Sequence, residues 1–153
     1  MQIPPEMQKL RAPLPADRRR LFAVASKYLF VSIGNRMVTI AVVEDDPSML
    51  QGLNRLLLAH GYRVEKFTSA ESFLDDAARC KAKCLLVDIH LGGMSGIDLK
   101  RRLASSGSDT PVIFMTAIDN EATRREAFDA GCVAYLRKPF LAKLLIDAIN
   151  SVL

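Results

Sequence analysis

The sequence predicts a doubly wound α/β fold in which five parallel strands alternate with five helices. Two observations predict it. Short apolar or β-branched runs alternate with amphipathic stretches from Met37 to the C-terminus, and glycines stand where several of the amphipathic stretches should end. Because each helix returns the chain to the same end of the sheet, this alternation requires parallel strands.

The first strand–helix unit is clearly marked. The run Val38 to Val43 is short and β-branched, as in a strand buried on both faces. Asp46 and Pro47 supply N-cap and first-turn chemistry, and leucines at helical spacing continue to Gly61. The same pattern recurs four times. We expect further strands at 62–67, 84–87, 112–115 and 132–136, and further helices at 69–78, 95–105, 120–130 and 141–152, with Gly107 and Gly131 as helix ends.

The charge is unevenly distributed along the 153 residues. The net charge of +4 invites a nucleic-acid interpretation. Residues 1–36, however, hold seven Lys and Arg against two acidic residues, whereas residues 37–153 hold 14 basic and 15 acidic residues. The basicity therefore belongs to the N-terminal stretch, and we expect no direct nucleic-acid binding by the domain at 37–153.

Residues 1–36 differ from the rest in composition. Four prolines and the run Arg18 to Arg20 indicate an extended basic arm, while Leu21 to Val31 is too short and too interrupted for a membrane anchor or a signal peptide. We expect either a partly disordered extension or a start assigned too early. Met37 begins the domain.

Three cysteines without the paired spacing of zinc sites indicate reduced thiols and a cytoplasmic protein. Cys80 and Cys84 would form a redox pair only if they lay one turn apart on a helix. We expect buried, inert thiols instead.

Acidic residues follow two of the predicted strands. Glu44, Asp45 and Asp46 come after the first strand, and Asp88 comes after the third. The carboxyl ends of parallel strands meet at one edge, where doubly wound folds bind ligands. Carboxylates gathered there repel one another unless a hard cation such as Mg²⁺ joins them. We assign Asp46 to helix capping, and Glu44 and Asp45 to metal chemistry.

Thr116 follows the fourth strand, and Arg137, Lys138 and Pro139 follow the fifth. A nucleophilic carboxylate, a cation site, a hydroxyl and an ammonium group are the parts needed to stabilise charge on a transferred phosphoryl group. Their placement after strands one, three, four and five indicates phosphoryl chemistry.

Four segments, VVEDDPSML, LLVDIHLGGMSGIDL, PVIFMTA and AYLRKPF, resemble the marker segments of response-regulator receiver domains. The resemblance covers residues 38–153. It implies a flavodoxin-like receiver fold with strand order 2-1-3-4-5.

The resemblance also implies a role for each matched residue. Asp88 would be the phosphoacceptor, Thr116 the switch hydroxyl, Tyr135 the switch aromatic, and Lys138, before a cis peptide bond to Pro139, the catalytic lysine. Mg²⁺ would be held by Asp45, Asp88, the backbone carbonyl of His90 and, through water, Glu44.

The chain departs from the family's pattern in two places. The loop after Asp88 has Gly92 and Gly93 where the family usually has Pro, which predicts a more mobile loop. Ile118, two residues after Thr116, predicts slow self-dephosphorylation because its apolar side chain hinders an attacking water. For the His90 ring we expect a solvent-facing position, with only the backbone taking part.

The resemblance implies a phosphoacceptor that catalyses only its own phosphorylation and dephosphorylation. Its partners would be a sensor histidine kinase or phosphotransfer protein, a downstream protein target, and a second copy bound through the fourth helix, fifth strand and fifth helix. Alternatives are a receiver cut from a longer DNA-binding regulator or a hybrid kinase, and an unphosphorylated interaction module. Two other classes of protein fit the sequence less well. An aspartyl-phosphate hydrolase would need an acidic residue at the position of His90. A flavodoxin-like cofactor binder would need a phosphate-binding loop after the first strand, where Glu44, Asp45 and Asp46 are found.

Overall fold

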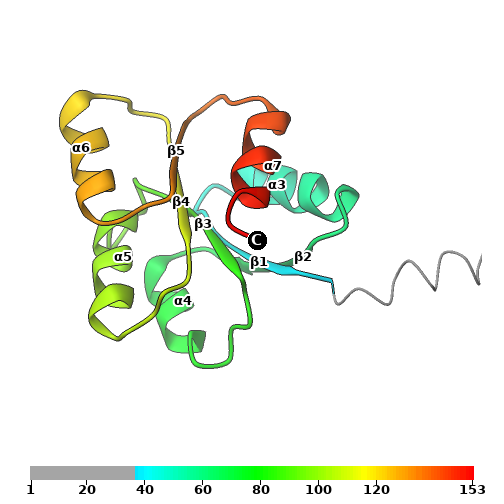
Figure 1. Cartoon of the computed structure of the whole chain (residues 1–153), viewed down its shortest axis with the longest axis horizontal. Coiled ribbons are helices and arrows are strands. Elements are labelled where there is room, and N and C mark those ends of the chain that lie inside the picture. The colour runs from blue at the N-terminus through cyan, green and yellow to red at the C-terminus, as the bar shows by residue number, and fades with distance from the viewer. Residues whose placement is uncertain (1–36) are drawn as a thin grey trace, which may run out of the picture. The chain divides into compact units, whose positions relative to one another are not determined.

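The computed structural model describes residues 37–153, and the predictions for residues 1–36 lie outside this part. Strands and helices alternate strictly along the chain (Figure 1). The strands are β1 (Thr39–Val43), β2 (Arg63–Phe67), β3 (Cys84–Asp88), β4 (Val112–Thr116) and β5 (Ala134–Arg137). The helices are α3 (Pro47–Ala59), α4 (Ala70–Asp76), α5 (Gly96–Ser105), α6 (Glu121–Asp129) and α7 (Ala142–Asn150).

The five strands form one parallel sheet in the order β2-β1-β3-β4-β5. The predicted doubly wound fold and its strand order are confirmed. In the register, Val43 of β1 stands beside Val87 of β3, so Glu44, directly after β1, and Asp88, the last residue of β3, lie side by side at the carboxyl edge of the sheet. The order reverses at this point, which is where doubly wound sheets bind ligands.

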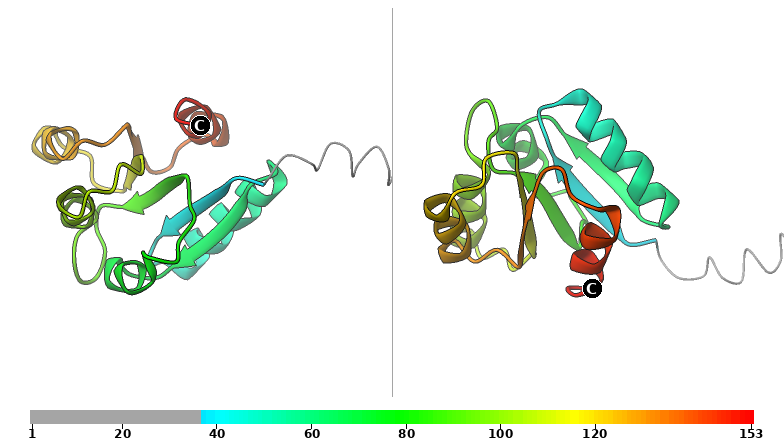
Figure 2. Two further views of the ribbon diagram at one scale, coloured as in Figure 1. Left: turned by 60° about the horizontal axis from the view of Figure 1, so that its bottom comes forward. Right: turned by 90° about the horizontal axis from the view of Figure 1, so that it is seen from above.

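Two hydrophobic cores lie on the two faces of the sheet. One joins alternate residues of the strands to α3 and α7, through Leu53, Leu57 and Leu145 among others. The other joins the intervening residues to α4, α5 and α6. The right-hand view of Figure 2 shows the sheet between these two groups of helices. Burial on both faces explains why the strand sequences are continuous apolar runs.

Local signals fix the ends of the helices. The side chains of Asp46, Ser69, Ser95 and Asn120 each accept a hydrogen bond from the backbone N–H three residues later, as N-caps do. After α3, α5 and α6 the chain turns through glycines with positive φ, an arrangement common at helix C-termini. These are Gly61, Gly107 and Gly131, with φ of 83°, 81° and 86°.

The structure differs from the sequence prediction at β5, which begins at Ala134 rather than Cys132. Cys132 lies in the turn after α6, because its N–H donates to the carbonyl of Ala127. Cys80 lies beyond the end of α4 and Cys84 begins β3, so the two thiols do not share a helix. Burial raises the pKa of Cys80 to about 11 and that of Cys84 to about 12, which keeps both thiols protonated.

None of the helices within residues 37–153 has the length and apolar content that a membrane-spanning helix requires.

Candidate functional site

The carboxyl edge of the sheet brings Asp88 together with the acidic residues that follow β1. Asp88 is the last residue of β3 and not, as predicted, the first residue after it. Glu44, Asp45 and Asp88 each offer a carboxylate oxygen, and the three oxygens lie within 4.8 Å of one another. Glu44 and Asp88 are only 1% and 6% exposed, whereas Asp45 is open to solvent. Asp46 does not join them, because its side chain caps α3 by accepting from the N–H of Met49 at 2.8 Å.

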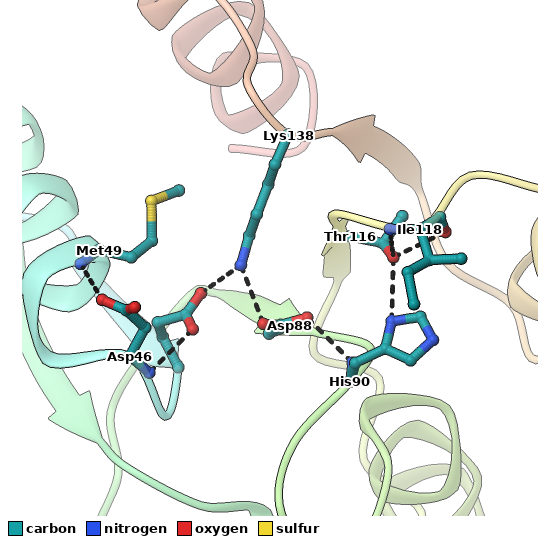
Figure 3. A network of polar contacts seen from close by, with 8 residues as sticks. Asp46, Met49, Asp88, His90, Thr116, Ile118 and Lys138 are labelled. Carbon is teal, nitrogen blue, oxygen red and sulfur yellow. Dashed lines mark hydrogen bonds and ion pairs between the residues drawn. The ribbon is translucent and has the colours of Figure 1, made fainter.

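Lys138 connects two of these carboxylates. Its Nζ donates to Oε2 of Glu44 at 2.6 Å and to Oδ2 of Asp88 at 2.9 Å (Figure 3). The other oxygen of Asp88 accepts from the N–H of His90 at 2.9 Å. The Asp88 carboxylate therefore turns toward the lysine at the sheet edge and not into the apolar interior. The Lys138–Pro139 peptide bond is cis, as the resemblance implies.

Burial and ion pairing have opposite effects in this cluster. Desolvation raises the pKa of Glu44, although the hydrogen bonds from Lys138 and from the Asp46 N–H lower it in part. Desolvation acts to lower the pKa of Lys138, but its hydrogen bonds to Glu44 and Asp88 and their negative charges outweigh that effect, so its pKa is raised. The lysine therefore stays charged between the two carboxylates.

Thr116 ends β4 beside this cluster but does not bond to Asp88. Its Oγ1 lies 3.1 Å from Nδ1 of His90, donates to the carbonyl of Ile118 at 2.9 Å and accepts from the Ile118 N–H at 3.1 Å. His90 is exposed, as expected, but its backbone is not the only part that makes contacts: one ring nitrogen contacts the threonine hydroxyl (Figure 3).

This arrangement occurs in a chain whose residues 40–150 match the family model of the response regulator receiver domain. The chain belongs to this family.

Curated relatives of this receiver are response regulators. The chain is 35% identical to the response regulator protein TmoT of Ectopseudomonas mendocina over 114 aligned residues, and this alignment covers 74% of the chain and 52% of TmoT. It is 34% identical over 121 residues to TodT of Pseudomonas putida, covering 79% of this chain and 53% of TodT. The chain spans about half the length of these relatives.

Solved receiver structures share the fold. FixJ-N is 30% identical, with a TM-score of 0.71 over 76% of this chain and 94% of that one. The response regulator StyR is 37% identical, with a TM-score of 0.71 over 76% of this chain and 59% of that one. The BeF3-activated receiver domain of DrrB is 28% identical, with a TM-score of 0.69 over 76% of this chain and 97% of that one.

The acidic cluster of this receiver fits a divalent cation. Mg²⁺ prefers oxygen ligands and is commonly bound by one or two carboxylates while it keeps several waters. Glu44, Asp45 and Asp88 provide such oxygens, and the exposure of Asp45 leaves room for water. Lys138 already partly neutralises Glu44 and Asp88, so the uncompensated charge lies near Asp45.

Tyr135 lies on β5, away from the carboxylates, and contacts α6. The Arg124 guanidinium lies 5.4 Å from the centre of the Tyr135 ring while it binds both carboxylate oxygens of Asp119. The Tyr135 hydroxyl is buried and makes no hydrogen bond of ordinary geometry within residues 37–153, although the Asp119 carboxylate lies near it. Burial, followed by the negative charge of Asp119, raises the pKa of Tyr135.

The loop after Asp88 depends on Glu71, which sequence reasoning missed. Oε1 of Glu71 accepts a 2.7 Å hydrogen bond from the N–H of Met94. A Cβ added to Gly93 would lie 2.6 Å from the same oxygen. The carboxylate therefore approaches the loop closely because Gly93 has no side chain. Whether the loop is more mobile than in other receivers stays a prediction.

Gly96, at the start of α5, is a second residue that sequence reasoning missed. A Cβ at this position would overlap the carbonyl oxygen of Asp88 and lie 2.8 Å from Cγ1 of Val87. Its N–H donates to the carbonyl of Ile89 at 3.0 Å. Gly96 thus lets α5 pack directly against the backbone that carries Asp88. The glycine directly after the N-cap Ser95 was the available signal.

Proposed function

We propose that this receiver accepts a phosphoryl group on Asp88 from the phosphohistidine of a sensor histidine kinase or phosphotransfer protein, and that phosphorylation changes the surface of α6 and β5. The observation that carries the proposal is the position of Asp88: its carboxylate accepts a hydrogen bond from the Lys138 ammonium group at 2.9 Å and lies close to two further carboxylates, those of Glu44 and Asp45. Membership of the response regulator family supports the histidine kinase as donor.

In the proposed transfer, a carboxylate oxygen of Asp88 forms a bond to phosphorus while the bond between phosphorus and the donor histidine breaks. The imidazole leaves with the electron pair of that bond. Lys138 already bonds to Asp88, so its charge is in position to stabilise negative charge that develops on the phosphoryl oxygens. The chain would catalyse only its own phosphorylation and dephosphorylation.

Asp45, Asp88 and the backbone carbonyl of His90 would hold Mg²⁺, with Glu44 acting through water. When bound, Mg²⁺ supplies positive charge close to the phosphoryl oxygens. Glu44 has a second role in the proposal. Its buried carboxylate accepts a hydrogen bond from Lys138 and so helps to hold the ammonium group in position.

Phosphorylation adds a dianion that needs hydrogen-bond donors. The Thr116 hydroxyl is the switch group in the proposal, and its movement toward Asp88 would leave space for the Tyr135 ring. The signal would then reach a downstream protein target, or a second copy, through α6, β5 and α7. Large hydrophobic side chains exposed on and around these elements support this surface, namely Ile118, Phe128, Val133, Leu141 and Leu144.

The relatives suggest where such a signal leads. TdiR of Thauera aromatica, 32% identical over 75% of this chain, is named a transcriptional regulatory protein, and this chain spans 51% of it. In our proposal residues 37–153 do not bind nucleic acid themselves, and control of transcription would belong to a partner or to a further domain. We also propose a cytoplasmic location.

The decisive experiment is incubation with a small phosphodonor and Mg²⁺, followed by intact mass measurement. We expect one phosphate adduct on the wild type and none on Asp88→Asn. Asp98→Asn is the matched control, because Asp98 is an exposed carboxylate on α5 away from the cluster, and it should be modified like the wild type. An adduct on Asp88→Asn, or none on the wild type, would refute the proposal.

A further inference from the structure

The hydroxyl of Thr116 has three hydrogen-bonding partners. It donates to the carbonyl of Ile118, accepts from the Ile118 N–H and lies 3.1 Å from Nδ1 of His90. A threonine hydroxyl has one proton to donate and two lone pairs to accept with. The Thr116 hydroxyl uses its proton to donate to the Ile118 carbonyl and one lone pair to accept from the Ile118 N–H. Only its second lone pair is left for His90. Nδ1 must then carry a proton and donate it.

We propose that His90 is a positioning residue whose ring donates from Nδ1–H to Thr116 and restrains the switch hydroxyl in the unphosphorylated receiver. This inference rests on the proposed function for its consequence. The same residue holds the phosphoacceptor, because its backbone N–H donates to Oδ1 of Asp88 at 2.9 Å. Figure 3 shows the backbone of His90 directed to Asp88 and its ring directed to Thr116.

The contact opposes switching. Thr116 makes no hydrogen bond to Asp88 within the described residues, so it must leave its present partners before it can reach a phosphoryl group there. A single hydrogen bond contributes about two- to tenfold to such an equilibrium. Loss of the imidazole should therefore favour the switched state by about this factor. His90 is exposed, so replacing its ring should leave the fold intact.

The hydrogen bond can be tested without any phosphoryl chemistry. Long-range ¹H–¹⁵N correlation spectra of the unphosphorylated protein report which ring nitrogen of a neutral histidine carries the proton. We expect Nδ1–H for His90. The Nε2–H tautomer would overturn the inference, because Nδ1 would then have no proton to donate.

The effect on switching can be measured with beryllofluoride and Mg²⁺, since beryllofluoride mimics a phosphoryl group. We expect His90→Ala to bind beryllofluoride about two- to tenfold more tightly than the wild type. His90→Asn should return the affinity toward the wild-type value, because its amide N–H can take the place of Nδ1–H. In a Thr116→Val background, which lacks the hydroxyl, His90→Ala should change nothing further.

Three results contradict the inference: unchanged or weaker binding by His90→Ala, no recovery by His90→Asn, or the same gain in the Thr116→Val background. Each of these results would mean that His90 does not restrain Thr116. The proposed function would still stand, provided that the wild type bound beryllofluoride. If the wild type bound no beryllofluoride and gained no phosphate on Asp88, the proposed function would fail, and the restraining role of His90 would fail with it.

Discussion

The ammonium group of Lys138 lies 2.6 Å from the buried carboxylate of Glu44, although the two residues are 94 positions apart in the sequence and follow strands β5 and β1, which have β3 and β4 between them. The same nitrogen reaches Asp88, so one cation serves two carboxylates that are almost fully buried. Charges in such surroundings are expensive to leave unpaired. The relationship therefore has consequences for stability as well as for chemistry.

Replacing Lys138 with Met should destabilise the domain. The variant keeps an apolar stem but leaves Glu44 and Asp88 without their cation. Breaking a buried ion pair costs roughly 3–5 kcal/mol, and because the Lys138 side chain is 16% exposed we expect about 2–4 kcal/mol. Urea unfolding measures this. Mg²⁺ should recover part of the loss, since a ligand that binds only the folded state stabilises it.

Lys143→Met is the matched control for this experiment. Lys143 pairs with Asp147 on the surface of α7, and its side chain is 80% exposed. Exposed helical pairs contribute only about 0.3–0.5 kcal/mol. Equal losses for the two lysine variants would contradict the account of the buried cluster.

Gly96→Ala should be destabilising because of where the added methyl group lies. It would overlap the Asp88 carbonyl, which belongs to the backbone and cannot move aside as a flexible side chain would. Overpacking of this kind costs about 1–3 kcal/mol, and a displaced Asp88 should also take up phosphate more slowly. Thermal unfolding and intact mass measurement report the two effects.

The control is Gly52→Ala, in the middle of α3, where nothing lies within 4 Å of the added Cβ. Alanine is favoured over glycine in helices by about 0.8–1.0 kcal/mol, so this variant should be more stable than the wild type. A stability loss at both glycines would show that the Asp88 carbonyl is not the cause.

The hydrogen bond from Met94 to Glu71 predicts a pH dependence. It stabilises the ionised carboxylate and so lowers the pKa of Glu71 below its ordinary value of 4.5. For a carboxyl group with a lowered folded-state pKa, the added stability is present above the unfolded value and is lost as the pH falls through the folded one. The difference in the free energy of unfolding between the wild type and Glu71→Gln should therefore become smaller as the pH falls below 4.5.

Urea unfolding across this pH range, together with hydrogen exchange of the Met94 amide, tests the prediction. Asp75→Asn is the control, because Asp75 lies on the same helix and its side chain makes no hydrogen bond or ion pair within residues 37–153. If Glu71→Gln and Asp75→Asn followed the same pH profile, or if the Met94 amide exchanged equally fast in the wild type and in Glu71→Ala, which lacks the acceptor, the hydrogen bond would have no role in holding the loop.

Sequence reasoning predicted the parts of this domain that leave a regular pattern. The apolar runs of the strands and the cap at Asp46 are local signals, and the carboxyl edge follows from the parallel topology. Asp88 and Lys138 could therefore be placed together although they lie 50 residues apart.

The remaining contacts of the site join single side chains that are distant in the sequence, and such contacts produce no repeating pattern in the sequence. Glu71 reaches the Met94 backbone from 23 residues away, and His90 reaches Thr116 from 26. Each depends on a rotamer and on loop geometry. A glycine can mark such a site, as Gly93 does beside Glu71, but the sequence alone does not say which atom approaches it.

Ile118→Glu should shorten the lifetime of the phosphorylated form. Ile118 is 56% exposed and its backbone bonds to the Thr116 hydroxyl, so a carboxylate there could orient a water toward the phosphoryl group. A well-positioned acid or base contributes about 10²–10⁴-fold, and an unoptimised glutamate should give less. Loss of the phosphate adduct over time after removal of the donor measures the rate. Ile118→Val is the control. Equal rates of dephosphorylation for Ile118→Glu and Ile118→Val would contradict the prediction.

Tyr135→Phe and Tyr62→Phe should have opposite effects on stability. The Tyr135 hydroxyl is buried without a hydrogen-bond partner in residues 37–153, and such a group costs about 1–3 kcal/mol. Its removal should be neutral or stabilising by about 1 kcal/mol. The Tyr62 hydroxyl donates to Asn150 at 2.6 Å, so its loss should cost about 0.5–1.5 kcal/mol. Both variants keep the aromatic ring, which makes urea unfolding a direct comparison of the two hydroxyls. A loss at Tyr135 as large as that at Tyr62 would mean that the Tyr135 hydroxyl has a partner in the folded state.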